Sequence, residues 1–435
     1  MDTTIEDQVG ERQIQVKFVT KLPPQLRVVS SAFAIPAKLG RYGLSEVVNT
    51  LLGLEKPQPF DFLIDGELLR TTVEQFLLTK GITAETTLTI EYIPVVLPPE
   101  PQQPRSHDEW VSAVSGYNAR FIATGSYDNH GRIWNASGEC VFLLQGHSDV
   151  ITSLAPIPAP GSSAKQFQLV TASKDHTLRF WQVALNEATS STVTLKPLKR
   201  LKGHTSSVQS VAASPSGHEV CSGSWDTSIK LWNLREETEG EEDLAGKKRR
   251  LETGAVNSSE KQVDARVTFQ GHTQVVGGLD WSDRDTIYSA SWDHSLRSWD
   301  VETAVNTQTL TSSKALHCLS VGGEGNALLA AGGADHLLRI WDPRLPGTVA
   351  PVFQLSSHTS WISACKWHPK SSFHILTASF DGTVKLWDTR ATIPLITLNQ
   401  HKDKVLSADW WKDDNIVSGG ADSQLHIYSK LNLSF

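Results

Sequence analysis

The sequence predicts a mainly β protein in which a small α+β module precedes seven repeated four-stranded units. Two observations support this prediction. An Asp followed six residues later by an aromatic residue recurs seven times, and the residues around each pair alternate between apolar and polar as strands do. Residues 12–95, which precede the repeats, instead show strand patterns interrupted by two helical ones.

Composition bounds the class of protein. The chain has 435 residues and a net charge of −7, which argues against a general nucleic-acid coat but not against a local basic patch. Four scattered cysteines without a C-x-x-C pair predict free thiols in a reducing compartment. The acidic start "MDTTIEDQVGERQ" does not fit a secretory signal, and no apolar run approaches the ~20 residues of a membrane span. We therefore expect a soluble intracellular protein that does not contact a membrane.

The repeat is defined by its Asp–aromatic pairs. They are Asp128 with Trp134, Asp175 with Trp181, Asp226 with Trp232, Asp293 with Trp299, Asp335 with Trp341, Asp381 with Trp387, and Asp422 with Tyr428. A His stands upstream of six of these Asp residues, namely His147, His204, His272, His317, His358 and His401. In the third unit, "SVQSVAASP", "HEVCSGS" and "SIKLWN" are predicted strands, and the turn Ser-Trp-Asp-Thr joins the last two.

These units resemble the WD-repeat family, which implies a seven-bladed β-propeller over residues 107–435. The resemblance also implies a structural role for the repeated residues. In each blade the turn Asp bonds the His, the His bonds a Ser or Thr, and that hydroxyl reaches the Trp. A catalytic role is disfavoured, because one active site would not be copied seven times.

Four units depart from the pattern. No His is recognised before Asp128, where the sequence reads "EWVSAVSG", no Gly precedes the His of units five to seven, and Tyr428 replaces a Trp. We expect weaker or incomplete networks there. The seventh unit also lacks an outer strand, so "TLTIEYIPVVLP" or the segment just after it is expected to supply one.

The N-terminal module has the element order of a ubiquitin-like β-grasp. Strands are predicted at 14–20, 27–36, 60–69 (a hairpin) and 87–93, with helices at 42–53 and 71–81. The first helix places Leu44, Val47, Val48, Leu51 and Leu52 on one face. Asp65 and Gly66 predict a type I′ hairpin turn.

Joined to a WD propeller, this module resembles the Notchless-like (NLE) domain of ribosome-assembly factors. The segments "LGRYGLSEVVNTLL", "PFDFLIDGELLRT" and "YIPVVLPP" are similar to those of the WD-repeat subunits of the pescadillo and block-of-proliferation complex. The resemblance implies a non-catalytic scaffold in large (60S) subunit assembly and pre-rRNA processing. It further implies a block-of-proliferation homologue, a pescadillo homologue and the pre-60S particle as partners, in the nucleus, nucleolus and nucleoplasm.

The same resemblance implies that the ubiquitin-like domain docks on the AAA+ ATPase midasin, which then removes the complex from the preribosome. Glu85, in "KGITAETTLTIEY", would complete a Mg²⁺ site held by that partner, and the chain would have no cofactor of its own. From the residues alone, an ordinary solvated glutamate at a turn is the simpler interpretation of Glu85, and only the resemblance favours the metal role.

Several surface features keep two interpretations. The residue before each turn Asp is predicted to project from the propeller rim. Four of these residues are aromatic, namely Tyr127, Trp225, Trp292 and Phe380. We interpret them either as contacts for a partner or as packing against neighbouring blades. Residues 96–106 form a Pro-rich linker, and 235–265 a charged insert without structure. Within that insert, "KKRR" is a nuclear-localisation signal, an RNA contact or a solvated loop; its residues are Lys247, Lys248, Arg249 and Arg250.

A rival function comes from "WDPR" at 341–344 and "WDTR" at 387–390. Both resemble the Trp-Asp-x-Arg motif of propellers that deliver substrates to cullin-type ubiquitin ligases. The same letters arise in any WD propeller at the end of a third strand, so the motif leaves both readings open.

Overall fold

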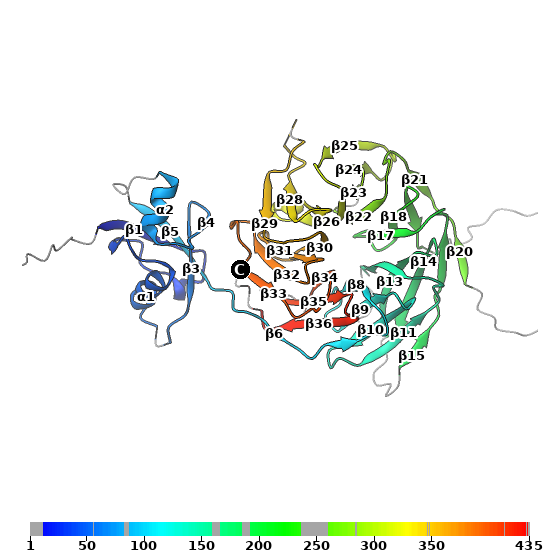
Figure 1. Cartoon of the computed structure of the whole chain (residues 1–435), viewed down its shortest axis with the longest axis horizontal. Coiled ribbons are helices and arrows are strands. Elements are labelled where there is room, and N and C mark those ends of the chain that lie inside the picture. The colour runs from blue at the N-terminus through cyan, green and yellow to red at the C-terminus, as the bar shows by residue number, and fades with distance from the viewer. Residues whose placement is uncertain are drawn as a thin grey trace, which may run out of the picture. The chain divides into compact units, whose positions relative to one another are not determined.

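The computed structural model describes residues 12–433 except 55, 82–86, 159–165, 185–191, 236–259, 283–284, 346, 348, 413 and 432. The chain forms two compact units, the first mainly up to Pro98 and the second mainly from Pro99 onward (Figure 1). Among the described residues no helix is both long and apolar enough to cross a membrane.

The first unit is a mixed five-stranded sheet with two helices. Its strand order is β2-β1-β5-β3-β4, with β1 and β5 parallel and the other pairs antiparallel. The strands are β1 (Gln13–Val19), β2 (Ala32–Pro36), β3 (Phe60–Ile64), β4 (Glu67–Leu68) and β5 (Leu88–Pro94). The helices are α1 (Arg41–Leu52) and α2 (Val73–Lys80), and a 3-10 turn, η1 (Pro24–Leu26), precedes β2.

Local chemistry sets the limits of these elements. Gly53 ends α1 in a left-handed conformation (φ 62°), and its N–H bonds to the carbonyl oxygens of Asn49 and Thr50. Thr72 caps α2 by accepting a hydrogen bond from the N–H of Gln75. Asp65 and Gly66 have φ of 52° and 81°, as a type I′ turn requires, so the predicted hairpin is confirmed.

The core of the first unit lies between the sheet and α1. Four aromatic side chains, Phe18, Phe60, Phe62 and Tyr92, are nearly or wholly inaccessible there. The Tyr92 hydroxyl donates to the carbonyl of Leu26 at 2.6 Å. The apolar face of α1 is narrower than its sequence predicted, since Leu51 is 38% exposed.

The second unit is a ring of seven antiparallel sheets, as the repeat predicted (Figure 1). Blade one contains β8 (Val111–Ser115), β9 (Phe121–Ser126), β10 (His130–Asn135) and β11 (Cys140–Gln145). Blade two contains β12 (Ile151–Ile157), β13 (Gln166–Ser173), β14 (Thr177–Ala184) and β16 (Lys199–Lys202). Blade three contains β17 (Val208–Ala213), β18 (Glu219–Ser224), β19 (Ile229–Asn233) and β21 (Val267–Phe269).

The remaining blades repeat the same order. Blade four contains β22 (Val276–Trp281), β23 (Thr286–Ser291), β24 (Ser295–Asp300) and β25 (Asn306–Thr311). Blade five contains β26 (Leu316–Gly322), β27 (Leu328–Gly333), β28 (Leu337–Trp341) and β29 (Phe353–Ser356), with the 3-10 turn η2 (Glu324–Asn326). Blade six contains β30 (Ile362–Trp367), β31 (His374–Ser379), β32 (Val384–Asp388) and β33 (Ile396–Leu398). Blade seven contains β34 (Val405–Trp411), β35 (Asn415–Gly420) and β36 (Gln424–Ser429).

Blade seven is completed by a segment from the other end of the chain. Two short strands, β6 (Glu100–Pro101) and β7 (Arg105–Ser106), pair antiparallel with β36. The expected outer strand therefore comes from the segment after "TLTIEYIPVVLP", within residues that the sequence assigned to a linker. The inner strands β34 and β8 pack side by side and close the ring.

Two further strands add an outer edge to blades one and two. β15 (Val193–Leu195) pairs parallel with β11, and β20 (Lys261–Val263) pairs parallel with β16. The expectation that all of 235–265 lacks structure is therefore wrong at its end, because backbone pairing with β16 orders Lys261–Val263 despite their polarity. Residues 236–259 lie outside the described residues.

Candidate functional site

Four blades contain an unbroken hydrogen-bond chain from the turn Asp to the third-strand Trp. In blade three, His204 Nδ1 lies 2.8 Å from Asp226, its Nε2 lies 2.8 Å from the Ser222 hydroxyl, and Trp232 Nε1 donates to that hydroxyl at 2.8 Å. A carboxylate only accepts, so Nδ1 carries the proton and Nε2 accepts from Ser222. The same geometry recurs in blades two, four and six, through His147–Asp175, His272–Asp293 and His358–Asp381. These chains lock strand register inside the blades, and no atom in them is left for catalysis.

Blade one contains a His that the sequence reading missed. His107 Nε2 lies 2.9 Å from the Thr124 hydroxyl, to which Trp134 donates at 3.0 Å. His107 stands 21 residues before Asp128, the separation that His272 has from Asp293, so spacing was the available signal. Asp128 turns away from it and pairs with Arg132 at 2.6 Å.

Blade five corrects the assignment of His317. This residue is the second of the inner strand β26, whereas the network histidines lie four residues before their inner strands. It cannot serve Asp335, which pairs instead with Arg339 at 2.6 Å. The indole N–H of Trp341 has no hydrogen-bond partner among the described residues, so this network is incomplete, as expected.

In blades six and seven, the absence of a Gly before the His does not break the contacts of that His with the turn Asp and the second-strand hydroxyl. Blade six is complete, and in blade seven His401 lies 3.0 Å from Asp422 and 2.8 Å from the Ser418 hydroxyl. The expectation of a weakened network is therefore wrong for blade six. In blade seven it is confirmed at the substituted position, because the Tyr428 hydroxyl is buried without a hydrogen-bond partner among the described residues. In blade seven, His401, Asp422 and His426 gather ligand atoms within 4.8 Å of one another, but both nitrogens of His401 are already used.

Aromatic rings from four consecutive blades form a continuous band, which we call the aromatic arc. Trp225 contacts Trp292 with ring centroids 5.1 Å apart, and Trp292 contacts His317 at 5.1 Å. His317 stacks on Trp361 at 5.3 Å, and Trp361 stacks on Phe380 at 6.1 Å. Trp225 and Trp361 are each 47% exposed. The arc therefore both packs between blades and presents ring faces to solvent.

Strand register explains which residues join the arc. The backbone N–H before each turn Asp donates to the residue before the inner strand, as Phe380 does to Trp361 at 2.9 Å and Tyr127 to Trp110 at 2.9 Å. The sequence analysis considered only the residue before each turn Asp. It therefore missed Trp361 and Trp110, which stand before inner strands, and did not place His317 among these aromatic residues. Tyr127 is separate from the arc and contacts Trp110 and Lys174.

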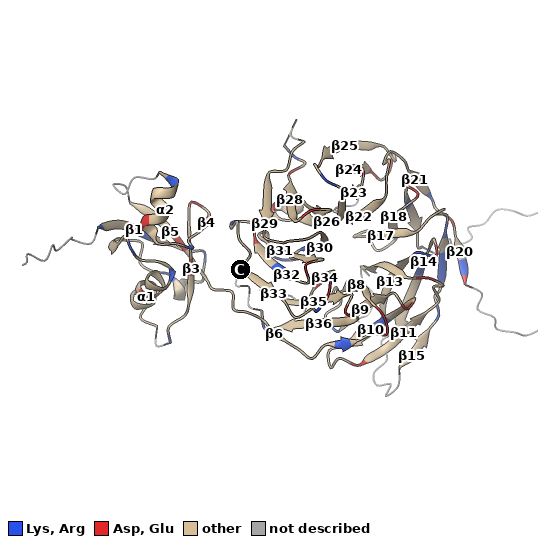
Figure 2. Ribbon diagram, viewed as in Figure 1, with Lys and Arg blue, Asp and Glu red and all other residues tan. Residues whose placement is uncertain are grey.

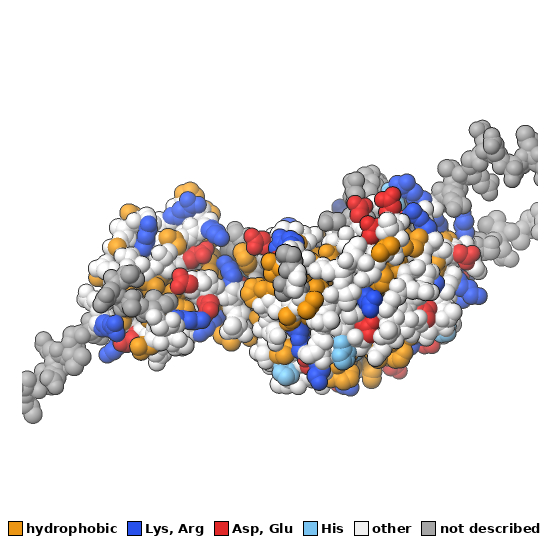
Figure 3. All heavy atoms as spheres, turned by 90° about the horizontal axis from the view of Figure 1, so that it is seen from above, with side chains coloured by type: hydrophobic (Ala, Val, Ile, Leu, Met, Phe, Trp, Pro, Cys, Tyr) orange, Lys and Arg blue, Asp and Glu red, His pale blue; other side chains and the backbone are white. Residues whose placement is uncertain are grey.

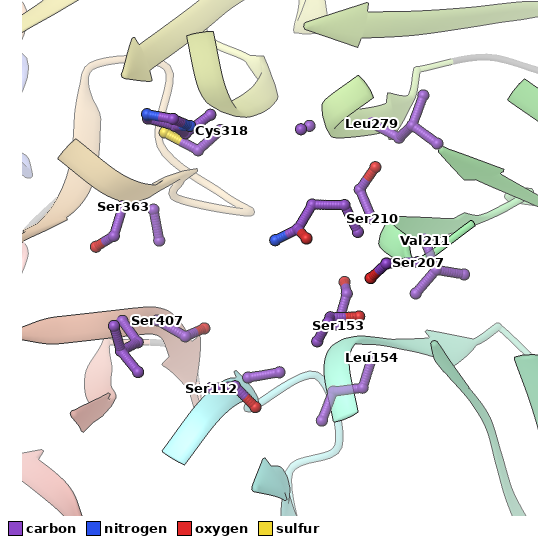
Figure 4. Close-up of a pocket in the computed structure, with 18 of the residues that line it drawn as sticks. Ser112, Ser153, Leu154, Ser207, Ser210, Val211, Leu279, Cys318, Ser363 and Ser407 are labelled. Carbon is purple, nitrogen blue, oxygen red and sulfur yellow. The ribbon is translucent and has the colours of Figure 1, made fainter. Parts of the chain in front are cut away.

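The arc borders a central cavity of about 750 Å³ (Figure 4). This cavity is lined by all four of the predicted rim aromatics, Tyr127, Trp225, Trp292 and Phe380. Figure 4 shows serines of several blades, including Ser112, Ser210, Ser363 and Ser407, around the opening. Four hydroxyls bridge neighbouring blades, since Ser112, Thr152, Ser210 and Ser363 donate to the carbonyls of Ile151, Val208, Val276 and Val405.

Polar atoms within the arc lack partners among the described residues. The indole N–H of Trp292 and Nε2 of His317 are buried without a hydrogen bond. Burial also lowers the pKa of His317, so the ring is neutral at pH 7. A buried donor without a hydrogen-bond partner costs about 1–3 kcal/mol of stability, whereas the exposed ring faces of Trp225 and Trp361 remain open to a partner. This arrangement fits a binding face.

Comparison with known proteins covers the whole chain. Residues 14–77 match the NLE (NUC135) domain, and seven segments between 101 and 429 match the WD domain, G-beta repeat. A ribosome biogenesis protein WDR12 homolog from Oryza sativa subsp. japonica is 51% identical over 97% of this chain and 98% of its own length. Homologs of the same name from Arabidopsis thaliana and Chlamydomonas reinhardtii are 50% and 37% identical, over 100% and 96% of this chain and 100% and 98% of their own lengths.

The chain belongs to the WDR12 family of ribosome biogenesis proteins. The resemblance seen in the sequence is thereby confirmed, as are the mainly β fold with seven WD repeats and the N-terminal NLE domain. For this WDR12-family chain, two sets of predicted residues, Glu85 and Lys247–Arg250, lie outside the described residues. The Arg of "WDPR" is already engaged, because Arg344 binds the carboxylate of Asp342 through two nitrogens, at 2.9 and 2.8 Å.

The buried histidines predict that the WDR12-family propeller loses stability below about pH 6.5. Burial, together with Arg132, lowers the pKa of His107 to about 4, and burial lowers that of His426 to about 4. Unfolded histidine titrates near 6.5, so between about pH 6.5 and 4 the unfolded chain binds more protons and stability falls as pH falls. For His107 the expected loss is about 3 kcal/mol. Urea unfolding midpoints measured across this range check it.

A second loss is expected at lower pH. Burial opposes ionisation of Asp175, Asp226, Asp293 and Asp381, but several effects together outweigh it and hold the pKa of each carboxyl well below its usual range. They are the hydrogen bond and charge interaction with the histidine and the hydrogen bonds from a side-chain hydroxyl and a backbone N–H. Stability from these groups is present above about pH 4 and is lost as pH falls further. The His107→Phe variant should lose part of the first phase and keep the second. An unchanged slope between pH 6.5 and 4 in that variant would contradict the assignment.

Proposed function

We propose that this chain is a non-catalytic scaffold in large ribosomal subunit assembly and pre-rRNA processing. The propeller binds a block-of-proliferation homologue in a complex with a pescadillo homologue on the pre-60S particle, in the nucleolus and nucleoplasm. The observation that supports this most directly is the aromatic arc, a half-exposed band of rings with unpaired buried polar atoms. Such rings are the side chains that dominate protein interfaces.

The first unit is proposed to dock on the ATPase midasin. In the sequence Glu85 stands between Gly81, the C-cap of α2, and Leu88, the first residue of β5. A carboxylate can fill an open coordination position on a partner's Mg²⁺. ATP-driven pulling through this contact would remove the complex from the preribosome without any catalytic residue in this chain.

The experiment is a binding assay between the full chain and midasin, with and without Mg²⁺. Glu85→Ala is expected to weaken the Mg²⁺-dependent binding at least 10-fold, since one ligand of the metal is lost. Glu67→Ala is the matched control, because Glu67 is an exposed glutamate of the same unit that pairs with Lys80 at 2.7 Å. Equal binding by both variants, or binding that survives chelation, would remove Glu85 from the mechanism.

The cullin-receptor alternative has no structural observation in its favour. The Arg344 side chain is paired with Asp342 in its own motif, so a ligase adaptor would have to compete for it.

A further inference from the structure

The outer edge of blade two places one cation directly opposite another. Arg179 on β14 faces Arg200 on β16 in antiparallel register. Like charges in this position destabilise a sheet. The equivalent third-strand cations of the other blades with described partners face uncharged residues; the pairs are Arg132–Leu143, Lys230–Thr268, Arg297–Thr309, Arg339–Gln354 and Lys385–Thr397. Blade two alone among these six carries the repulsion.

Only one of the two guanidinium groups is neutralised within the described part of the chain. Arg179 pairs with Glu260 at 2.7 Å. Arg200 has no ion pair there, and its Nε is buried without a hydrogen-bond partner. Burial lowers the pKa of Arg179, and the charge on Arg200 adds to that effect. The positive charge of Arg200 at this sheet edge is therefore not neutralised by any described residue, and a bound anion could neutralise it.

The positive charge continues along the surface. Lys202 follows Arg200 on the same face of β16 and is exposed, whereas Lys261 on β20 pairs with Lys199 and lies on the other face. A Cβ built on Gly203 would lie 3.7 Å from Cδ of Lys230, so blade three adds its cation next to Lys202. We call this set the basic edge; it consists of Arg179, Arg200, Lys202 and Lys230. Figure 2 shows Lys and Arg at β14 and β20, and Figure 3 shows them gathered at that end of the propeller.

The local balance of charge opposes that of the whole molecule. Beside these four cations stand the acids Asp175, Glu260 and Asp264, whereas the chain carries a net charge of −7. The strands of the basic edge present no exposed aromatic ring among their described residues, since Phe180, Trp181 and Phe269 are all buried. A typical protein interface would have such an anchor. The edge therefore fits a partner recognised by charge.

We propose that the basic edge binds the phosphate backbone of RNA. Guanidinium groups match phosphate oxygens in a two-pronged geometry, and an unpaired arginine beside a second arginine gains most from a bridging phosphate. Cations on one face recur about 7 Å apart along a strand and about 5 Å apart between strands, so a chain of phosphates can meet several of them. The choice of RNA among polyanions rests on the proposed function in ribosome assembly. Recognition of this kind is independent of base sequence.

The test measures binding of the purified full chain to a 20-nucleotide single-stranded RNA by fluorescence anisotropy over a salt series. The double variant Arg200→Glu/Lys202→Glu is expected to bind at least 10-fold more weakly near 150 mM salt. Its log–log salt slope should be shallower by about 1.4, because two phosphate contacts are lost. Arg120→Glu/Lys314→Glu, which changes two exposed cations elsewhere on the propeller by the same charge, should bind as the parent does.

Thermal unfolding separates this role from a structural one. A carboxylate in place of Arg200 would face Arg179 and relieve the repulsion, so the Arg200→Glu variant should melt no lower than the parent chain. Weaker RNA binding with an undiminished melting temperature supports the proposal. A lowered melting temperature in Arg200→Glu, with RNA binding unchanged in the double variant, would show that the basic edge is structural.

Two further results would overturn it. Equal losses of RNA binding in the double variant and in its control would mean that only overall charge matters. Displacement of RNA by poly-glutamate at equal charge concentration would point to an acidic protein segment as the partner. Glu85→Ala should bind RNA like the parent chain, so failure of the midasin contact and failure of RNA binding are distinguishable. Lys247–Arg250 remain unchanged in every variant.

Discussion

Replacing Trp232 with Ala is expected to lower the free energy of unfolding of the propeller by about 4 kcal/mol. Trp232 is fully buried in the core between blades two and three, among Val211, Val220 and Leu201. The substitution leaves a cavity the size of an indole and also removes the donor to the Ser222 hydroxyl. Urea unfolding followed by far-ultraviolet circular dichroism measures the change in midpoint.

Matched variants separate volume from hydrogen bonding. Trp225→Ala removes an identical side chain that is 47% exposed, and should cost about 1 kcal/mol or less. Trp232→Phe loses the indole N–H, whereas Trp341→Phe removes an N–H that has no partner. The first should cost about 1 kcal/mol more than the second. A loss for Trp232→Ala no greater than that for Trp225→Ala would contradict the structural role of the network.

The double variant Trp292→Ala/Trp361→Ala is expected to weaken binding of the block-of-proliferation homologue by up to about 4 kcal/mol, or about 10³-fold. The two rings flank His317 from opposite sides, at 5.1 and 5.3 Å, so each supports the position of the other. Their losses should therefore not add exactly as independent terms would. Biolayer interferometry with the single and double variants measures both the total and the coupling.

The control is Tyr117→Ala, which removes a ring that is 59% exposed and does not belong to the arc. Affinity should be unchanged in that variant. Unfolding midpoints establish that the arc variants retain the fold. An affinity within twofold of the parent after removal of both tryptophans would place the partner on another surface.

Much of the fold follows from local sequence. The Asp–Trp spacing predicted seven sheets because each unit repeats the same turn, and "LIDGELL" predicted a type I′ hairpin because only a short list of residues adopts positive φ twice in succession. These features depend on neighbours along the chain, which the sequence displays directly.

The site depended on contacts between distant residues. His107 was missed because its Thr124 partner is recognisable only once the strands are paired, and His317 was misassigned because its place in β26 depends on where that strand begins. The aromatic arc joins residues from blades three to six, so no window of sequence contains it. The same holds for the basic edge, where Arg179 and Arg200 meet across β14 and β16.

The seam in blade seven has a mechanical consequence. The strands that seal the ring, Glu100–Pro101 and Arg105–Ser106, directly follow the first unit and pair with β36 at only a few positions. Tension applied to the chain before Pro99 would therefore load these bonds before any other part of the propeller. Force on that segment would therefore act first on the strand pairing that closes the ring, and last on the blades farthest from it.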